Sequence, residues 1–184
     1  MNKERVRKLV RELIIELGED PTREGLRGTS ERIAEMYEEI FSGYDSDSEL
    51  SVQFSEDSDA VVVKDIKFYS MCEHHILPFF GKISIAYLPN GRVFGVSKLV
   101  RLVEKYAKRL QIQERMTKNI ADELYAQGVK GVMVLSDAEH FCMKMRGVKN
   151  DATMTSVAYR GFYERKENRE DVVAMIRNSK SSIL

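Results

Sequence analysis

The chain has 184 residues, enough for one domain with a sizeable core and too few for two domains of ordinary size. Its 29 Lys and Arg residues balance 29 Asp and Glu residues, so no long-range field favours nucleic acid or an anionic membrane surface as a partner. The first residues hold only a brief apolar run at 13–15, unlike a signal peptide, and no stretch approaches membrane-spanning length. We therefore expect a cytoplasmic protein whose two cysteines are thiols.

The N-terminal part of the chain is predicted to be helical. Apolar residues at helical spacing predict a helix over residues 1–17, ended by Gly18, and a second helix after Thr29 that runs to Gly43. The segment from 42 to 59, rich in Ser, Asp and Glu, is typical of a loop. We take residues 1–45 as an N-terminal helical region and residues 46–184 as a single functional unit.

From Ala60 onward the composition favours β-structure. Asn90-Gly91 is a strong hairpin turn signal between two of the predicted strands. β-prone segments predict strands at residues 61–63, 66–69, 80–88, 93–96, 129–145 and 153–163.

Helical periodicity returns twice within this second part. It predicts helices at about residues 98–109 and 113–126, with Gly128 as the stop of the second, and a charged helix closes the chain. Strands and helices in this order indicate the α+β class. Ser97 is predicted as an N-cap with Lys98 and Arg101 in the first turn, where amide groups and two cations would stabilise an anion.

All three histidines and both cysteines lie in two short segments, Cys72-Glu73-His74-His75 and His140-Phe141-Cys142. Sulfur and imidazole ligands from two distant segments are typical of a zinc site. Cys72 and His75 have the spacing of two ligands that leave one tight turn, and Cys142 could supply a third. Three protein ligands leave a position open for water, which is the catalytic pattern, and His74 and His140 would then be free for proton transfer.

The predicted strand at 129–145 suggests how a nucleotide could lie beside such a metal. Alternate side chains of a strand share a face, so His140, Cys142, Lys144 and Arg146 would line one side. Four strand residues span roughly 13 Å, which is the scale of a nucleotide. A metal at one end of this face and phosphates at the other would fit.

Two other interpretations of the cysteines and histidines remain open. A disulfide between Cys72 and Cys142 is the first. The second is a structural or binding protein in which zinc joins the Cys72–His75 turn to the strand at Cys142. Four protein ligands, completed by His74 or His140, would distinguish that structural site from a catalytic one.

Longer motifs surround these residues and cover about residues 18–165. In order they are EDPTREGL, ERIAEMY, SMCEHHILPFFGKISIAYLP, VFGVSKLVRLVE, QIQERMTKNIADEL and EHFCMKMRGV. This ordered set closely resembles the GTP cyclohydrolase I family. The resemblance implies an enzyme that opens the imidazole ring of GTP, releases carbon 8 as formate, and recloses the remainder as 7,8-dihydroneopterin triphosphate. It leaves open whether a folate or another pterin route uses the product.

The resemblance also implies a fold and an assembly. The fold is the tunnelling fold (T-fold), an antiparallel sheet with helices on one side and an N-terminal helical extension, here with residues 46–184 as the catalytic domain. The assembly is a toroidal homodecamer with active sites at subunit contacts. A related T-fold enzyme that acts on another purine or pterin is the alternative.

Roles for individual residues follow from the same resemblance. Cys72, His75 and Cys142 would bind Zn²⁺, and His74 and His140 would be catalytic, with His140 as the principal acid. The expected substrate-binding residues are Gln113 and Glu114 at the guanine, and Arg32, Ser97, Lys98, Arg101 and Arg146 at the ribose and triphosphate.

Overall fold

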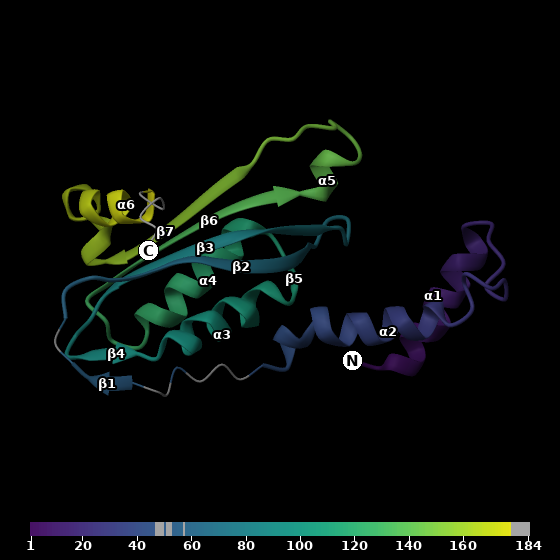
Figure 1. The fold of residues 1–184 in the computed structure, drawn as a ribbon, viewed down its shortest axis with the longest axis horizontal. Helices are drawn as coiled ribbons and strands as arrows, with labels where there is room; N and C mark the ends of the chain where they lie inside the picture. The colour runs from purple at the N-terminus through teal and green to yellow at the C-terminus, as the bar shows by residue number, and fades with distance from the viewer. Residues whose placement is uncertain (47–49, 51–52, 57, 178–184) are drawn as a thin grey trace, which may run out of the picture.

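The computed structural model describes residues 1–46, 50, 53–56 and 58–177. Two helices form an arm that extends from one end of a twisted sheet, and further helices pack on that sheet (Figure 1). The helices are α1 (Lys3–Glu16), α2 (Thr29–Ile40), α3 (Val96–Ala107), α4 (Gln113–Tyr125), α5 (Phe141–Lys144) and α6 (Glu170–Arg177), with 3-10 helices η1 (Ser42–Tyr44), η2 (Phe162–Glu164) and η3 (Lys166–Asn168).

The main sheet has five strands in the order β5-β2-β3-β6-β7. Its ladders are antiparallel except for β2 and β5, which pair in parallel, so the α+β class is confirmed while the purely antiparallel sheet is not. The strands are β1 (Gln53–Ser55), β2 (Val61–Cys72), β3 (Pro78–Leu88), β4 (Arg92–Phe94), β5 (Leu110–Gln111), β6 (Gly131–His140) and β7 (Met154–Gly161).

The predicted hairpin across Asn90-Gly91 is wrong. Gly91 has the positive φ of 73° that a tight turn favours, but β4 does not return along β3. Both edges of β3 already carry long ladders, to β2 on one side and β6 on the other, so no hydrogen-bonding edge remains for β4. The chain pairs β4 with β1 instead and forms a small separate sheet.

One face of the main sheet carries the larger core. Along β2, Phe68 and Cys72 are buried while Lys67 and Tyr69 point to the opposite face and are exposed, as the alternation of a strand requires. Helices α3 and α4 cover the buried face with residues that are fully or almost fully buried, among them Leu99, Leu102, Val103, Met116, Ile120 and Leu124.

The opposite face of the sheet is partly covered by α6. Val172 and Ile176 of this helix are buried together with Ala86, Met133 and Tyr163. Figure 1 shows α6 across the sheet from α3 and α4. The prediction of helices on one side only is therefore wrong, because the apolar stripe of the C-terminal helix covers the second face.

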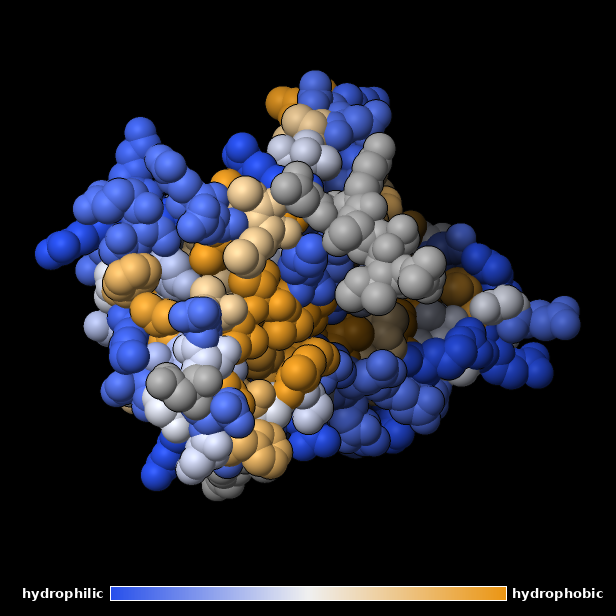
Figure 2. Space-filling model, turned by 60° about the vertical axis from the view of Figure 1, so that its left-hand side comes forward, coloured by the Kyte–Doolittle hydropathy of each residue, from blue (hydrophilic) through white to orange (hydrophobic). Residues whose placement is uncertain are grey.

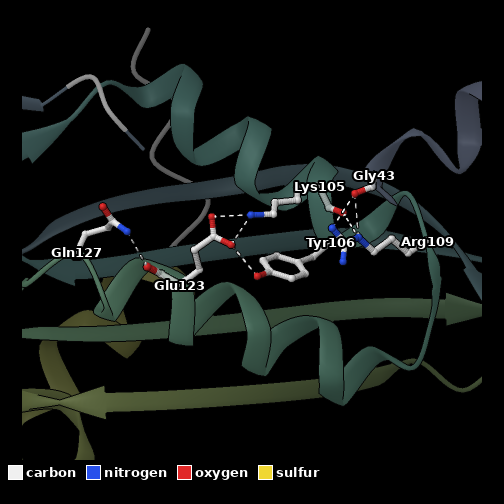
Figure 3. A network of polar contacts seen from close by, with 6 residues as sticks. All are labelled: Gly43, Lys105, Tyr106, Arg109, Glu123 and Gln127. Atoms are coloured by element: carbon white, nitrogen blue, oxygen red, sulfur yellow. Dashed lines mark hydrogen bonds and ion pairs between the residues drawn. The ribbon is translucent and has the colours of Figure 1, made fainter. Parts of the chain in front are cut away.

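The arm joins the rest of the chain through η1. Arg109 donates to the carbonyl oxygen of Gly43 at 2.6 and 3.0 Å, and the backbone N–H of Leu110 donates to the Tyr44 hydroxyl at 3.0 Å. Figure 3 shows the Arg109–Gly43 contact beside the Lys105–Glu123 ion pair of 2.7 Å that joins α3 to α4. The domain boundary expected after residue 45 lies just past η1 and stays a prediction.

Tyr106 completes the contacts between α3 and α4. Its hydroxyl donates to the Glu123 carboxylate at 2.6 Å (Figure 3), and burial, with that carboxylate, raises the pKa of Tyr106.

None of the helices in the described ranges is long and apolar enough to cross a membrane.

Candidate metal centre and active site

Three potential metal ligands meet where β2 ends. Sγ of Cys72, a ring nitrogen of His75 and Sγ of Cys142 lie within 4.8 Å of one another, and Cys72 Sγ is 3.9 Å from His75 Nδ1. In the part of the chain that the structure describes, no fourth His, Cys, Asp or Glu joins this group. Both cysteines are free thiols. The structure thus has three clustered ligands rather than a disulfide or a four-ligand set.

Two of these ligands leave the tight turn between β2 and β3. The turn is closed by hydrogen bonds from the Cys72 N–H to the Leu77 carbonyl and from the Ile76 N–H to the Cys72 carbonyl, each 2.9 Å. Ile76 has φ of +51°, which is strained for a β-branched residue. A strained turn persists only where its surroundings hold it, and the Glu73 N–H accordingly donates to the carbonyl of Gln111 in β5 at 3.0 Å.

The third ligand lies on a helix, so the strand predicted over 129–145 is wrong at its end. Strand β6 stops at His140, which pairs with Phe79 near the start of β3, and α5 follows at once. Beyond this point only Pro78 of β3 remains, and because proline has no backbone N–H to donate, the ladder ends and the chain turns into a helix. The shared strand face for His140, Cys142, Lys144 and Arg146 therefore does not exist, and the Lys144 ammonium lies 2.5 Å from Glu139.

Arg146 nevertheless reaches the metal ligands. Its Nη1 donates to Nε2 of His75 at 2.6 Å, and because a guanidinium has no acceptor, the imidazole accepts on that nitrogen. The Nδ1 atom of the same ring faces Cys72. Arg146 is thus close to the ligand cluster, not at the far end of a strand face, and its role at the substrate stays a prediction.

The chemistry of the three ligands fits a zinc ion. Two thiols and one imidazole are typical of the donors that bind it. Burial, and after it the neighbouring Cys72 thiol, raise the pKa of Cys142, whereas Arg146 lowers it. A bound cation would oppose the first two effects, because a coordinating thiol loses its proton.

His140 is held by a buried polar network. Its ring stacks on Phe79 with centroids 4.8 Å apart and planes 3° from parallel, and its Nε2 lies 2.8 Å from Oε1 of Gln113. Gln113 is 1% exposed, and its amide nitrogen donates to the carbonyl oxygens of Ser136 and Met154 at 2.9 Å. Burial lowers the pKa of His140, while the charge of Glu114 opposes this shift.

Gln113 and Glu114 therefore do different things, although the family pattern pairs them at guanine. Gln113 is buried and bonded to the protein, so its side chain does not face a ligand. Glu114 is exposed at the start of α4 and lines a hollow of about 630 Å³ together with Lys118, Tyr159 and Arg160. Direct contact with a base is open to Glu114 alone of this pair.

The remaining candidates lie away from this cluster in a single chain. Helix α3 begins at Val96 with Gly95 as its N-cap, so Ser97 is inside the helix and its predicted capping role is wrong. Figure 1 shows the start of α3 beside β4, at the other end of the sheet from the end of β2. Ser97 is separated from the end of α3 by roughly 15 Å of helix. Lys98 and Arg101 share this first part of α3.

Arg32 and His74 complete the set of predicted site residues. Arg32 lies on the arm, where it donates to the Thr29 hydroxyl at 2.8 Å and to the carbonyl of Arg27. His74 is exposed, and its ring centroid lies 6.3 Å from that of His75. One chain therefore brings His74, His140, Glu114 and Arg146 to the end of the sheet that holds the ligands, but not Arg32 or the first turn of α3.

Comparison with known proteins gives consistent matches over almost the whole chain. The model of the family GTP cyclohydrolase I matches residues 6–177. GTP cyclohydrolase 1 of Hyperthermus butylicus is 52% identical over 177 residues, 96% of this chain and 91% of that protein. The enzyme of the same name from Clostridium kluyveri is 52% identical over 184 residues, 96% and 99% of the two chains. That from Finegoldia magna is 54% identical over 170 residues, 89% and 92%.

Among solved structures, the archaeosine synthase QueF-Like in the apo form is similar with a TM-score of 0.47 and 18% identity, over 58% of this chain and 97% of that one. The relatives found by sequence are much more similar to this chain, because about half of all positions are identical over nearly the full length. The chain therefore belongs to the GTP cyclohydrolase I family.

Proposed function

We propose that this protein hydrolyses the imidazole ring of GTP, releases carbon 8 as formate, and recloses the remainder as 7,8-dihydroneopterin triphosphate. The observation that carries the proposal is the cluster of Cys72, His75 and Cys142 in a chain of this family. His140 precedes Cys142 by two residues. The three-ligand set favours a catalytic over a structural metal site, since zinc in structural sites is almost always bound by four protein ligands.

Zinc is the metal that these donors favour. Cys72, His75 and Cys142 would hold it, and when bound it would act as a Lewis acid that makes water nucleophilic near neutral pH. Arg146, now on Nε2 of His75, lies where it can contact a substrate that reaches the metal.

His140 is the proposed principal acid. Gln113 occupies its Nε2, so Nδ1 is the ring nitrogen that remains for proton exchange with the purine. Stacking on Phe79 prevents rotation of the ring and keeps that nitrogen in one direction. His74, exposed in the metal-ligand turn, is the second proposed proton carrier.

Recognition of guanine falls to Glu114. Its carboxylate can accept hydrogen bonds from the ring N–H and the exocyclic amine, a pair of donors that adenine does not offer. The hollow beside it, about 630 Å³, has the volume of a small-molecule site.

We further propose a homo-oligomer of T-fold subunits, a decamer on the family pattern, with sites completed across subunit contacts. Arg32, Ser97, Lys98 and Arg101 would then bind the ribose and triphosphate at the metal centre of a neighbouring subunit. The arm supports self-association, because Leu13 of α1 and Leu17 directly after α1 are 56% and 72% exposed. Figure 2 shows a further group of apolar side chains in a hollow of the face that it presents. The cytoplasm remains the expected location.

The test is to incubate the metal-replete protein with GTP and to follow formate together with the ultraviolet spectrum of a dihydropterin triphosphate. We expect both products, and their loss after chelation. Formate without the pterin would support the ring-opening step and contradict the reclosure step. Neither product from a zinc-loaded protein would favour the alternative of a related T-fold enzyme with another purine or pterin substrate.

A further inference from the structure

We propose that the ion pair between Glu73 and Arg115 is a clamp that positions the metal-ligand turn, and that it sets the affinity of the protein for its metal. The inference rests on the metal site of the proposed function. Neither residue is a ligand, so Glu73 and Arg115 act as positioning residues.

The clamp engages the turn between its two ligands. Glu73 follows Cys72 directly and precedes His75 by two residues, and the turn also contains Ile76 at φ of +51°. Backbone strain of this kind relaxes unless contacts from outside the segment oppose it. If the turn relaxed, His75 would move relative to Cys72, and the distance between the two ligands would no longer suit one ion.

The geometry of the pair is that of a fork. Arg115 Nη1 lies 2.5 Å from Glu73 Oε2, and Nη2 lies 3.1 Å from Oε1. Two parallel bonds between planar groups fix orientation as well as distance. The side chains of Glu73 and Arg115 remain 30% and 46% exposed, so the pair adds little to the stability of the whole domain. Its effect should therefore be local, on the conformation of the turn.

Arg115 is well placed to act as a fixed reference. It lies two residues after Gln113 in the first turn of α4, and the buried amide of Gln113 prevents rotation of this helix by its bonds to Ser136 and Met154. Gln113 holds His140 from the same turn. The start of α4 thus sets the position of both the ligand turn and the proposed acid.

The experiment measures the dissociation constant for Zn²⁺ in the full-length protein by competition with a chromophoric chelator. For Arg115→Gln we expect the affinity for Zn²⁺ to fall about tenfold. Loss of a residue that orients a metal ligand typically costs about 10- to 100-fold in affinity, and we expect the smaller value because the pair is partly exposed. Electrostatics alone predicts the opposite sign, since loss of a positive charge favours a bound cation. The direction of the change therefore separates positioning from charge.

Further variants sharpen the test. Arg115→Lys keeps the charge without the fork and should give an intermediate affinity. Glu73→Gln should also weaken zinc binding. The double variant, Glu73→Gln with Arg115→Gln, should bind zinc no more weakly than whichever single variant binds it less tightly, because both changes remove the same interaction. Arg23→Gln is the matched control, because it removes an exposed pair of 2.8 Å with Glu19 on the arm and should leave affinity unchanged.

Cobalt provides a second readout of the ligand geometry. The thiolate-to-cobalt and d–d absorption bands of the Co²⁺-loaded Arg115→Gln protein should shift, while those of Arg23→Gln should match the parent. Zinc affinity of Arg115→Gln equal to or above that of the parent would overturn the proposal. Failure of this variant to fold would also overturn it, since the pair would then support the domain and not the turn.

The parent protein separates this inference from the proposed function. A parent that binds no zinc, or releases no formate from GTP, contradicts the function itself. An active, zinc-binding parent whose affinity is unaffected by loss of Arg115 contradicts the clamp alone.

Discussion

Oε1 of Gln113 accepts a hydrogen bond from Nε2 of His140 at 2.8 Å, and the remainder of Gln113 dictates that direction. The amide nitrogen faces three oxygen acceptors, namely both oxygens of Ser136 and the carbonyl of Met154, so the amide oxygen must be the atom on the histidine side. A proton of His140 is thereby assigned to Nε2, so Nδ1 is the nitrogen that would take up and give up the proton in the proposed reaction. A residue buried in the core thus determines which ring nitrogen of His140 is engaged inside the protein.

Replacement of Gln113 by Leu should separate this role from folding. Turnover of GTP should fall about 100-fold, because a proton carrier that is displaced by about 1 Å loses rate on this scale. The free energy of unfolding should fall by about 1–3 kcal/mol, because buried acceptors lose their donor. Steady-state kinetics and urea denaturation measure the two effects. Gln127→Leu, which replaces an exposed Gln shortly after α4, is the control. If the Gln113→Leu enzyme kept the turnover of the parent, Gln113 would not be needed to position His140.

Cys142→Ser and His140→Ala should fail in different ways. Serine cannot replace a thiolate ligand, so Cys142→Ser should lose zinc and turnover together. His140→Ala should keep zinc, because Nε2 is bonded to Gln113 and the residue is outside the ligand cluster, yet turnover should fall by about 10²–10⁴-fold. Metal analysis and formate release measure both. Loss of zinc from His140→Ala would show that the ligand assignment is incorrect.

Glu114→Ala should weaken use of GTP without a change in metal content. Removal of hydrogen bonds to a charged acceptor should lower kcat/KM by about 10- to 100-fold, equivalent to about 1.5–3 kcal/mol. The proposed role of Glu114 is to bind the guanine base and not the metal ion, so the zinc stoichiometry of the variant should equal that of the parent. Unchanged kinetics with GTP would remove Glu114 from the site.

Gly81→Ala should disrupt the sheet beside the metal-ligand turn. A Cβ at this position would overlap the carbonyl oxygen of Asp137 on β6, and backbone cannot move aside as a flexible side chain can. We expect a loss of about 1–3 kcal/mol in the free energy of unfolding, measured by thermal or urea denaturation. Gly25→Ala is the control, because the added carbon would approach only the mobile end of Arg23 at 3.0 Å. Equal stability of the two variants would contradict this account of β3 and β6.

The sequence determined those features that depend on residue type and on local spacing. The helices α1 to α4 follow from apolar periodicity within one segment. Helix α1 ends close to Gly18 and α4 ends close to Gly128, both of which have positive φ. The ligand cluster follows from residue chemistry, because Cys72, His75 and Cys142 belong to the few soft donors of the chain. The family motifs added the reaction that we propose for this protein.

Only the tertiary structure decided what depends on distant partners. Strand β6 ends at His140 because only Pro78 of β3, which has no N–H to donate, lies beyond its last pair. Strand β4 leaves β3 because β3 is paired on both sides, and Gln113 is buried because of oxygen acceptors in β6 and at the start of β7. The Glu73–Arg115 pair joins residues 42 positions apart. Such contacts require edges and partners that lie far away in the chain, and no local pattern of side chains encodes which of them are already occupied.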